Sequence, residues 1–214
     1  MTTSDRTTVR RLPEKQVDDR VVLNAIVDAG RVGHLAVVDE TEQPFVLPVA
    51  YAREGDSLLI HGSTASRLFR SLAAGANTCL TVTHLDGLVL ARSAFASSMR
   101  YRSAMVFGSC DLVKGTDKLR ALEILTEHLL PNRWETLRAP LSKEIAATMI
   151  LSLPIAEWSV KVSDGWPNLS EDPCASAPHR SEHCWAAVVV HRSNEIPLAD
   201  KTAVPDDCHR QPRV

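Results

Sequence analysis

The sequence is first defined by what it has little of. Aromatic residues make up 5% of its 214 residues, and no run of about 18 apolar residues occurs, which excludes a membrane-spanning helix. Basic and acidic residues number 24 and 26, so charge favours neither nucleic acid nor an anionic membrane as the main partner. The first twenty residues lack the apolar stretch of an export signal. We therefore expect a cytoplasmic protein.

Cysteine is also scarce, and the five cysteines are an odd number without regular spacing. This argues against a disulfide framework. Cys79 and Cys110 lie in apolar, strand-like runs, where a thiol acts as a small buried hydrophobe. The motifs of P-loop nucleotide triphosphatases and of Gly-x-Ser-x-Gly hydrolases do not occur.

The C-terminal region offers metal-ligand residue types, but in an unfavourable context. Cys174, His179, His183 and Cys184 are chemically suited to zinc, yet their spacing is irregular. The segment from His179 to His183 matches the H-x-x-E-H pattern of one protease class, which requires a helix, whereas Pro178 and a Pro- and Ser-rich neighbourhood oppose one. We predict no metal site; a zinc-binding tail that recruits a partner is the weakest hypothesis.

Hydrophobic periodicity predicts a mainly β protein with peripheral helices. Short extended runs follow one another without a helix long enough to cross between parallel strands, so the sheet should be antiparallel, as a small barrel or else a sandwich. The predicted helices are 17–29, 68–74, 117–130 and 142–149; the predicted strands are 32–38, 45–52, 57–61, 78–83, 88–95, 101–113 and 150–162, with 185–191 as an addition. His84-Leu-Asp-Gly87 is predicted to be a hairpin turn between two of these strands.

Composition divides the chain into three regions. Residues 1–16 form a polar arm, residues 17–162 the barrel domain, and residues 163–214 an extended arm that holds half of the 12 prolines and three of the five cysteines. An arm of this kind typically crosses to a partner subunit or covers a pocket.

The segment His61-Gly-Ser-Thr-Ala-Ser-Arg67 places hydroxyl groups and a guanidinium where a strand passes into a helix. Such groups suit a phosphate. The alternative is that Ser63 or Ser66 caps the helix and Arg67 is solvated. His61 is of interest because it ends a strand directly before this segment, whereas His34, within a strand, is more typical of a core or interface residue.

Two further arginines, Arg100 and Arg102, alternate with Tyr101 and Ser103 and so share one face of a strand. They are either part of a solvated exterior or a second contact for an anion.

These segments together resemble the FMN-binding split-barrel family related to pyridoxamine 5'-phosphate oxidase, and within it the branch of nitroimidazole-resistance reductases and flavin-nucleotide-binding proteins. The resemblance extends from about residue 10 to residue 162. It rests on Gly33-His-Leu-Ala, Pro44-Phe-Val-Leu-Pro-Val-Ala-Tyr51, Leu59-Ile-His-Gly-Ser-Thr-Ala-Ser-Arg67, residues 81–95 and Tyr101-Arg-Ser-Ala-Met-Val-Phe-Gly108.

The resemblance implies a homodimeric split antiparallel β-barrel with FMN bound at the subunit interface. By position, it implies phosphate contacts, isoalloxazine contacts and further cofactor contacts. The implied residues are Ser66 and Arg67 with Ser63 and Thr64 nearby for the phosphate, Val46, Leu47 and Pro48 along the ring, His61 beside the flavin, Arg102 and Ser103 on a neighbouring strand, and Trp185 from the C-terminal arm.

Two departures from the family pattern stand out. Leu68 occupies the position of a lysine in the oxidase proper, which removes one phosphate contact and weakens the case for pyridoxamine-phosphate oxidation. Ala96, Ser97 and Arg100 replace histidine and asparagine residues frequent in the branch.

The resemblance therefore implies an FMN-dependent oxidoreductase acting on a small acceptor of nitroaromatic or quinone type, with a nicotinamide as candidate electron donor. His61 is the candidate catalytic residue, for substrate contact or proton donation, because imidazole titrates near neutral pH; a structural hydrogen bond at the barrel rim is the alternative. The second hypothesis is a non-catalytic protein that binds flavin, haem or deazaflavin F420 as a carrier or sensor.

Overall fold

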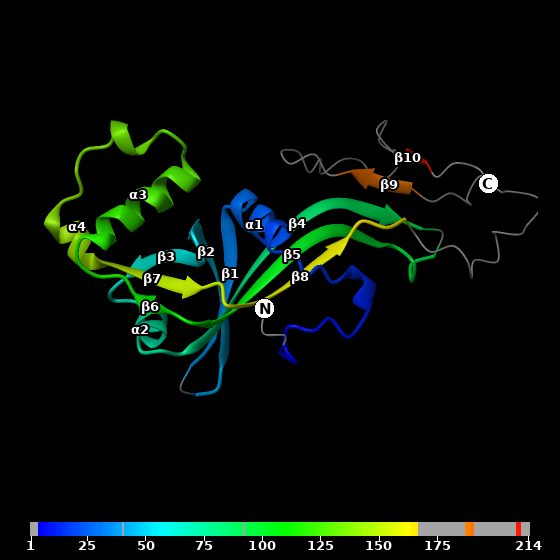
Figure 1. The fold of residues 1–214 in the computed structure, drawn as a ribbon, viewed down its shortest axis with the longest axis horizontal. Coiled ribbons are helices and arrows are strands. Elements are labelled where there is room, and N and C mark those ends of the chain that lie inside the picture. The colour runs from blue at the N-terminus through cyan, green and yellow to red at the C-terminus, as the bar shows by residue number, and fades with distance from the viewer. Residues whose placement is uncertain (1–3, 40, 92, 167–186, 191–208, 211–214) are drawn as a thin grey trace, which may run out of the picture. The chain divides into compact units, whose positions relative to one another are not determined.

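The structure is a computed structural model that describes residues 4–39, 41–91, 93–166, 187–190 and 209–210 (Figure 1). Its strands are β1 (Val32–Val38), β2 (Pro44–Glu54), β3 (Ser57–Ser63), β4 (Asn77–Leu90), β5 (Ser98–Ser109), β6 (Asp111–Leu112), β7 (Thr148–Pro154), β8 (Glu157–Ser163), β9 (Ala187–Val190) and β10 (His209–Arg210). Its helices are α1 (Arg20–Ala29), α2 (Arg67–Ala73), α3 (Asp117–Leu129) and α4 (Ser142–Ala147), with short 3-10 turns at Pro13–Lys15 and Trp134–Thr136.

The fold is a split antiparallel β-barrel, as the sequence predicts. The strand order is β10-β9-β4-β1-β2-β3-β7-β6, and β5 pairs with β4 and β8. The chain forms two compact units, Met1–Thr83 with Ser103–Lys161 and His84–Arg102 with Val162–Val214.

Strand β2 is the point at which the sheet of the first unit divides. Its first half pairs with β1, from Val38↔Pro44 to Val32↔Ala50, and its second half pairs with β3, from Tyr51↔Ile60 to Glu54↔Ser57. One long strand therefore belongs to two pairings in succession. The edge of its first half that faces away from β1 has no partner strand in the described pairings.

Side chains of β1 alternate between the two faces of the sheet, as the period of a strand requires. Leu35 and Val37 are buried in the interior, whereas Val32, His34 and Val38 are exposed. The register places Pro48 opposite His34 and Val46 opposite Ala36. We call the surface formed by the outward residues of β1 and β2 the outer face.

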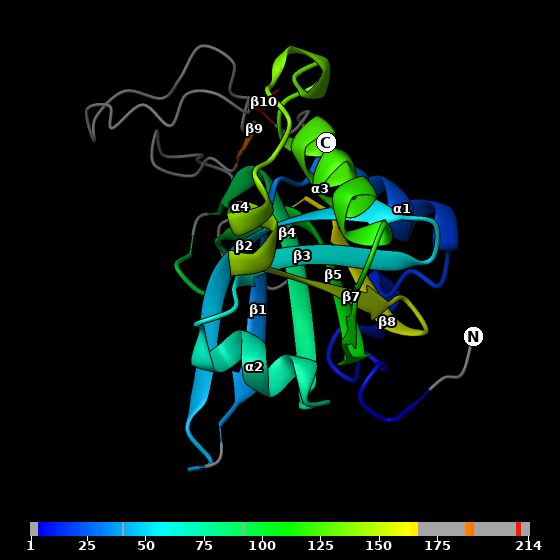
Figure 2. The ribbon, with the colours of Figure 1, turned by 90° about the vertical axis from the view of Figure 1, so that its left-hand side faces the viewer.

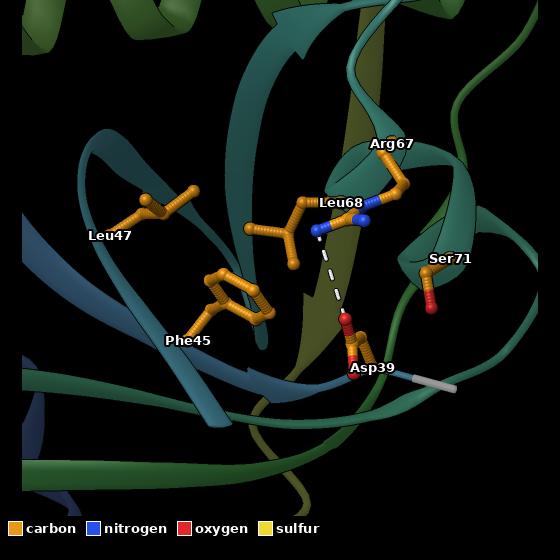
Figure 3. A pocket seen from close by; sticks show the side chains of 6 residues that line it. All are labelled: Asp39, Phe45, Leu47, Arg67, Leu68 and Ser71. Carbon is orange, nitrogen blue, oxygen red and sulfur yellow. Dashed lines mark ion pairs between the residues drawn. The ribbon is translucent and has the colours of Figure 1, made fainter. Parts of the chain in front are cut away.

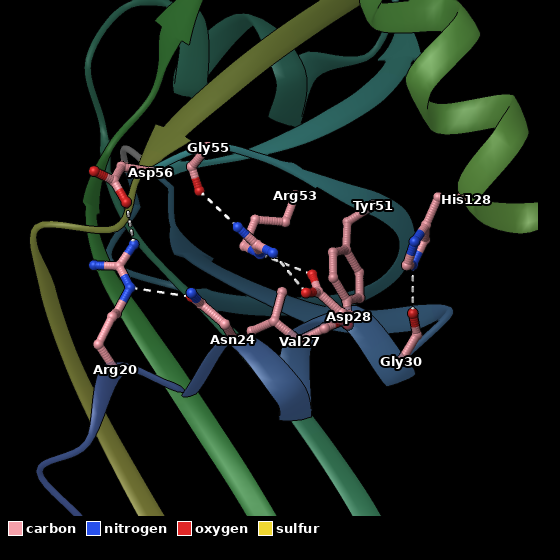
Figure 4. Close-up of polar contacts among 10 residues, drawn as sticks. All are labelled: Arg20, Asn24, Val27, Asp28, Gly30, Tyr51, Arg53, Gly55, Asp56 and His128. Carbon is pink, nitrogen blue, oxygen red and sulfur yellow. Dashed lines mark hydrogen bonds and ion pairs between the residues drawn. The ribbon is translucent and has the colours of Figure 1, made fainter. Parts of the chain in front are cut away.

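Helix α1 closes the interior against Tyr51, a fully buried side chain of β2. Asp19 caps the helix through a hydrogen bond from the Val21 N–H, and Leu23, Ile26 and Val27 are buried. The Tyr51 hydroxyl donates to the Val27 carbonyl at 2.6 Å (Figure 4). This bond satisfies the one polar atom that Tyr51 carries into the core.

Polar contacts at the rim of the same region fix α1 and α3 in place. Arg53 forms a two-pronged ion pair with Asp28, with distances of 2.7 and 2.5 Å (Figure 4). His128 of α3 lies 2.6 Å from the Gly30 carbonyl through Nε2, and its ring is 5.8 Å from that of Tyr51. The imidazole of His128 is therefore engaged in holding the fold.

Helix α3 covers the part of the sheet formed by β2, β3 and β7 (Figure 2). Ala121 and Leu125 pack against Ala52, Leu59 and Ile150 in one buried cluster. The helical spacing of the apolar residues, which the sequence already displays, matches this single buried face.

Two element predictions are wrong. The predicted strand 150–162 is divided into β7 and β8 by a turn at Ile155 and Ala156. The segment His84–Gly87 is not a turn, because β4 runs without interruption from Asn77 to Leu90. Gly87 and Leu88 are paired with Val190 and Val189 of β9. Pairing with neighbouring strands therefore overrides the local turn preference of Asp86-Gly87.

The N-terminal residues pack on β8 within the first unit. Glu157 accepts hydrogen bonds from Ser4 and from Arg6, the latter at 2.8 Å, and Val17 N–H donates to the Val160 carbonyl. The bond from Arg6 and the bond from Ser4 lower the pKa of Glu157. Among the described residues, no helix is long and apolar enough to span a membrane.

Candidate functional site

The outer face is apolar and exposed, and it carries two histidines. Val32, Val38 and Val46 are 51%, 55% and 60% exposed. His34 of β1 lies among them, opposite Pro48 on β2 and Thr81 on β4. An exposed apolar sheet surface of this kind is typical of a site for a planar ligand or a partner chain.

His61 belongs to the same side of the sheet. The side chain of His61 points away from the buried side of Ile60 and Tyr51, to the side on which α3 covers Leu59. His61 is exposed, yet the protein atoms around its imidazole disfavour the charged form and lower its pKa. The ring is therefore neutral at pH 7, with a nitrogen lone pair available for a proton or a metal ion.

The histidines of the first unit thus differ in availability. His128 is committed to the Gly30 carbonyl, whereas neither His34 nor His61 has a hydrogen bond or ion pair among the described residues. His34 is exposed, so it is not a core residue; its placement at an interface stays a prediction.

The hydroxyl-rich segment after β3 is ordered by its own hydrogen bonds. Ser66 caps α2 by accepting from the Phe69 N–H at 3.4 Å, Ser63 accepts from the Ala65 N–H at 3.1 Å, and Thr64 donates to the Ala147 carbonyl at 3.1 Å. The helix-capping interpretation is thus confirmed for Ser66. Ser63 and Thr64 remain exposed, so phosphate binding by this segment stays a prediction.

Arg67 and its surroundings form a small pocket of about 90 Å³ between the end of the β1–β2 hairpin and α2 (Figure 3). The walls are apolar side chains, Phe45 and Leu47 on the strand side and Leu68 on the helix side. The Arg67 guanidinium lies 5.5 Å from the centroid of the Phe45 ring. Its side chain is 75% exposed and is therefore free to reorient.

A carboxylate lies at the floor of this pocket. Asp39 Oδ1 accepts three hydrogen bonds, from the backbone and hydroxyl of Thr41 and from the backbone of Gln43. The hydroxyl of Thr41 is the main cause of the lowered pKa of Asp39, which is therefore ionised at neutral pH. Oδ2 is 3.7 Å from Arg67 and accepts no hydrogen bond within the described chain.

Sequence reasoning did not single out Asp39 or Phe45. Asp39 falls between the predicted strands 32–38 and 45–52, and Phe45 is one apolar residue of the second of them. The pattern Asp39-x-Thr41-x-Gln43 is a recognisable signal for a carboxylate that binds its own turn. No local signal indicates that this carboxylate meets Arg67, 28 positions later.

The remaining predicted contacts lie elsewhere in the chain. Arg102, in the second unit, forms a two-pronged ion pair with Asp86, both distances being 2.8 Å. The side-chain bond from Arg102 is the main cause of the lowered pKa of Asp86. Arg100 donates to the carbonyls of Asp164 and Gly165, so both arginines of this face are engaged.

Two further predicted positions complete the set. Ser103 is half-buried on β5, in the first unit. Trp185 lies outside the described residues, as do Cys174, His179, His183 and Cys184. In the described part of the chain, no group of three or more His, Cys, Asp or Glu side chains is arranged to hold a metal ion.

Comparison with known proteins assigns the class of this fold. The family model of pyridoxamine 5'-phosphate oxidase matches residues 19–162, which contain every described site residue named above. The chain therefore belongs to the pyridoxamine 5'-phosphate oxidase family. The predicted relation to this family is confirmed.

Two solved structures are similar along nearly the whole chain. The FAD and haem binding protein from Mycobacterium smegmatis is 38% identical, with 90% of this chain and 95% of that chain covered and a TM-score of 0.75. The flavocytochrome Anf3 from Azotobacter vinelandii is 39% identical, with 95% and 92% covered and a TM-score of 0.80. A comparison with curated protein sequences finds no similar one.

A third structure shares the fold alone. The putative 5-nitroimidazole antibiotic resistance protein from Bacteroides thetaiotaomicron is 20% identical, with 69% of this chain and 86% of that chain covered and a TM-score of 0.59.

Proposed function

We propose that this chain is a flavin- and haem-binding redox protein. The observation that carries the proposal is its 38–39% identity, over at least nine-tenths of each chain, to one protein described as binding FAD and haem and to another described as a flavocytochrome. The first of these relatives favours FAD over FMN as the flavin. FMN remains the alternative that the first experiment separates.

The outer face has the properties that a planar, largely apolar cofactor needs. The exposed residues Val46 and Pro48 offer an apolar surface on β2, and the unpaired edge of this half of the strand leaves backbone groups available to hydrogen-bond a ring. Arg67, with its exposed guanidinium, is the candidate for contact with the cofactor's phosphate. These features support flavin binding in the first unit.

His61 is the residue that would hold the iron if the chain binds haem. Ligation requires a neutral imidazole with a free ring nitrogen, and His61 has a lowered pKa and no hydrogen bond within the described chain. His34 meets the second condition and serves as the comparison. A neutral His61 is also suited to hold a proton for a substrate beside a flavin, which is the catalytic role predicted from the sequence.

When bound, the haem supplies one-electron chemistry at iron and the flavin supplies one- or two-electron chemistry. The residues of the chain bind and orient these groups and exclude water from the apolar face. In the catalytic form of the proposal, electrons from a nicotinamide pass to a small acceptor such as a quinone or nitroaromatic compound. The non-catalytic form is a carrier or sensor.

We further propose that the protein is a homodimer. The support is the row of exposed apolar side chains on β1 and β2, which a second copy of the chain would cover. Sedimentation velocity at several concentrations tests this; a monomer at all of them would contradict it.

The first test is the visible spectrum of the purified protein, followed by mass spectrometry of the released cofactors. We expect flavin absorption near 450 nm together with an intense Soret band, and FAD rather than FMN in the released fraction. A protein that stays colourless after incubation with FAD, FMN and haemin would overturn the proposal, and a deazaflavin in the released fraction would redirect it.

The role of His61 is tested by His61→Ala, with His34→Ala as the matched control on the same face. We expect His61→Ala to lose the Soret band while retaining flavin, and His34→Ala to keep both. If His61→Ala keeps its Soret band and loses only turnover with a nicotinamide donor and quinone acceptors, the residue is catalytic and not an iron ligand. Unchanged spectra and turnover would contradict both roles.

A further inference from the structure

The pocket at Asp39, Phe45 and Leu68 has no role in the site described so far. It lies on the side of the β1–β2 hairpin opposite the outer face, since Phe45 and Leu47 alternate with Val46 and Pro48. It is small, at about 90 Å³, and open on one side. We propose that it holds the adenine ring of a flavin adenine dinucleotide and thereby selects FAD over FMN; this inference rests on the proposed flavin binding.

The first argument is the shape and polarity of the walls. Phe45 and Leu68 provide two apolar surfaces, and the Arg67 guanidinium already lies over the aromatic ring at 5.5 Å, where a planar π-system packs well (Figure 3). Because the Arg67 side chain is 75% exposed, it can turn toward a phosphate and leave the face of Phe45 to a purine.

The second argument is the hydrogen-bonding capacity of the pocket. Asp39 Oδ2 is an ionised acceptor without a hydrogen bond in the described chain, and its side chain is only 16% exposed. It suits the exocyclic amino group of adenine, while the hydroxyl of Ser71, also in the pocket wall, suits a ring nitrogen. Guanine carries two adjacent N–H donors that require both oxygens of a carboxylate. Asp39 offers only Oδ2, because Oδ1 already accepts three hydrogen bonds.

The third argument is the balance of charge beside Arg67. The terminal phosphate of FMN carries close to two negative charges and favours a second cation, whereas each phosphate of a pyrophosphate bridge carries one. Here the position after Arg67 is Leu68, and the carboxylate of Asp39 lies 3.7 Å from Arg67. The side chain at this position is therefore apolar, whereas a lysine there would provide a second positive charge for a terminal phosphate.

The test compares the affinities of the apoprotein for FAD and FMN by fluorescence quenching. We expect the wild type to prefer FAD. Phe45→Ala should lower the affinity for FAD by roughly 5- to 100-fold, the usual effect of losing a base-stacking aromatic residue. The affinity for FMN should change by no more than about two-fold. Leu68→Lys should reduce the ratio of FAD affinity to FMN affinity by about ten-fold or more, because it lowers the affinity for FAD and raises the affinity for FMN.

Matched controls and a probe without flavin sharpen the comparison. Leu119→Lys adds the same charge at an exposed leucine of α3, outside the pocket, and should leave the FAD to FMN ratio unchanged. AMP should compete with FAD and not with FMN, GMP should compete with neither, and Asp39→Asn should abolish the effect of AMP.

The outcomes separate the two proposals. If neither flavin binds, the proposed function fails. If flavin binds but the wild type prefers FMN, if Phe45→Ala and Leu68→Lys change FAD and FMN affinities equally, or if AMP does not compete, flavin binding stands and the adenine pocket is refuted.

Discussion

The hydroxyl of Tyr51 provides a sharp test of how α1 is held against the barrel. The side chain is fully buried, and its only hydrogen bond in the described structure is the one it donates to the Val27 carbonyl at 2.6 Å. Tyr51→Phe removes the donor while keeping the ring. The Val27 carbonyl still accepts the Gly30 N–H at 3.2 Å, so it is not left without a partner.

The expected cost at neutral pH follows from this residual bond. Loss of a typical intramolecular hydrogen bond costs about 1 kcal/mol, and the larger penalty for an orphaned buried acceptor does not apply. For a chain of this size, about 1 kcal/mol lowers the melting temperature by roughly 2–4 °C. Urea unfolding should show a lower midpoint with an unchanged dependence on denaturant concentration.

The same substitution has the opposite effect at high pH. Burial, with a smaller contribution from the charge of Asp28, raises the pKa of Tyr51 above its ordinary value near 10. Above pH ~10 the unfolded chain loses this proton and the folded chain keeps it, so wild-type stability falls by up to about 1.4 kcal/mol per pH unit. Tyr51→Phe lacks this loss, and the two proteins should become equally stable near pH 11.

The control is Tyr101→Phe at the other tyrosine of the chain, which is half-buried and whose hydroxyl makes no hydrogen bond within the described residues. At neutral pH its free energy of unfolding should lie within ~0.5 kcal/mol of that of the wild type. The reasoning fails if Tyr51→Phe is as stable as the wild type at pH 7, or if the difference between them does not shrink between pH 9 and 11.

Two further predictions concern the ends of β3 and α4. Gly62→Ala places a methyl carbon 2.5 Å from the buried Phe69 ring, so this ring must shift from its packed position. We expect the free energy of unfolding in urea to fall by about 1–3 kcal/mol, and an unchanged midpoint would contradict the packing. At α4, hydrogen bonds from Arg138 and from the Leu141 N–H lower the pKa of Glu144 to about 2. This stabilisation is present above the unfolded pKa near 4.5 and is lost as the pH falls toward 2. The NMR chemical shift of the Leu141 amide should therefore follow the protonation of Glu144 near pH 2, and this change should be absent in Glu144→Gln.

Part of the fold is legible in the sequence because its cause is local. The alternation from Val32 to Val38 predicts a strand with one buried face, and the structure has that strand with those bounds. The apolar period after Asp117 likewise predicts the helix that packs on the sheet. Both predictions depend only on the spacing of side chains along one element.

The error at Asp86-Gly87 has a tertiary cause. The dipeptide is a strong turn signal when it stands alone. In the fold, Asp86 binds Arg102 and Gly87 is paired with Val190, so both residues lie within an extended strand. The partners in these interactions lie far away in the sequence, so the four residues 84–87 alone cannot indicate their stabilising effect.

The site divides in the same way. The hydroxyl-rich segment at the end of β3, a helix cap at Ser63 or Ser66 and the relation to a flavin-binding family are all predictable from the sequence, because they depend on short segments and their order. The fold brings Asp39 and Phe45 beside Arg67 and Leu68, and strand pairing directs His34 and His61 to the same side of the sheet. These contacts depend on strand register and on the division of β2 between two partner strands. A side chain's neighbours across a sheet are set by pairing between residues far apart in the sequence, so adjacent residues do not reveal them.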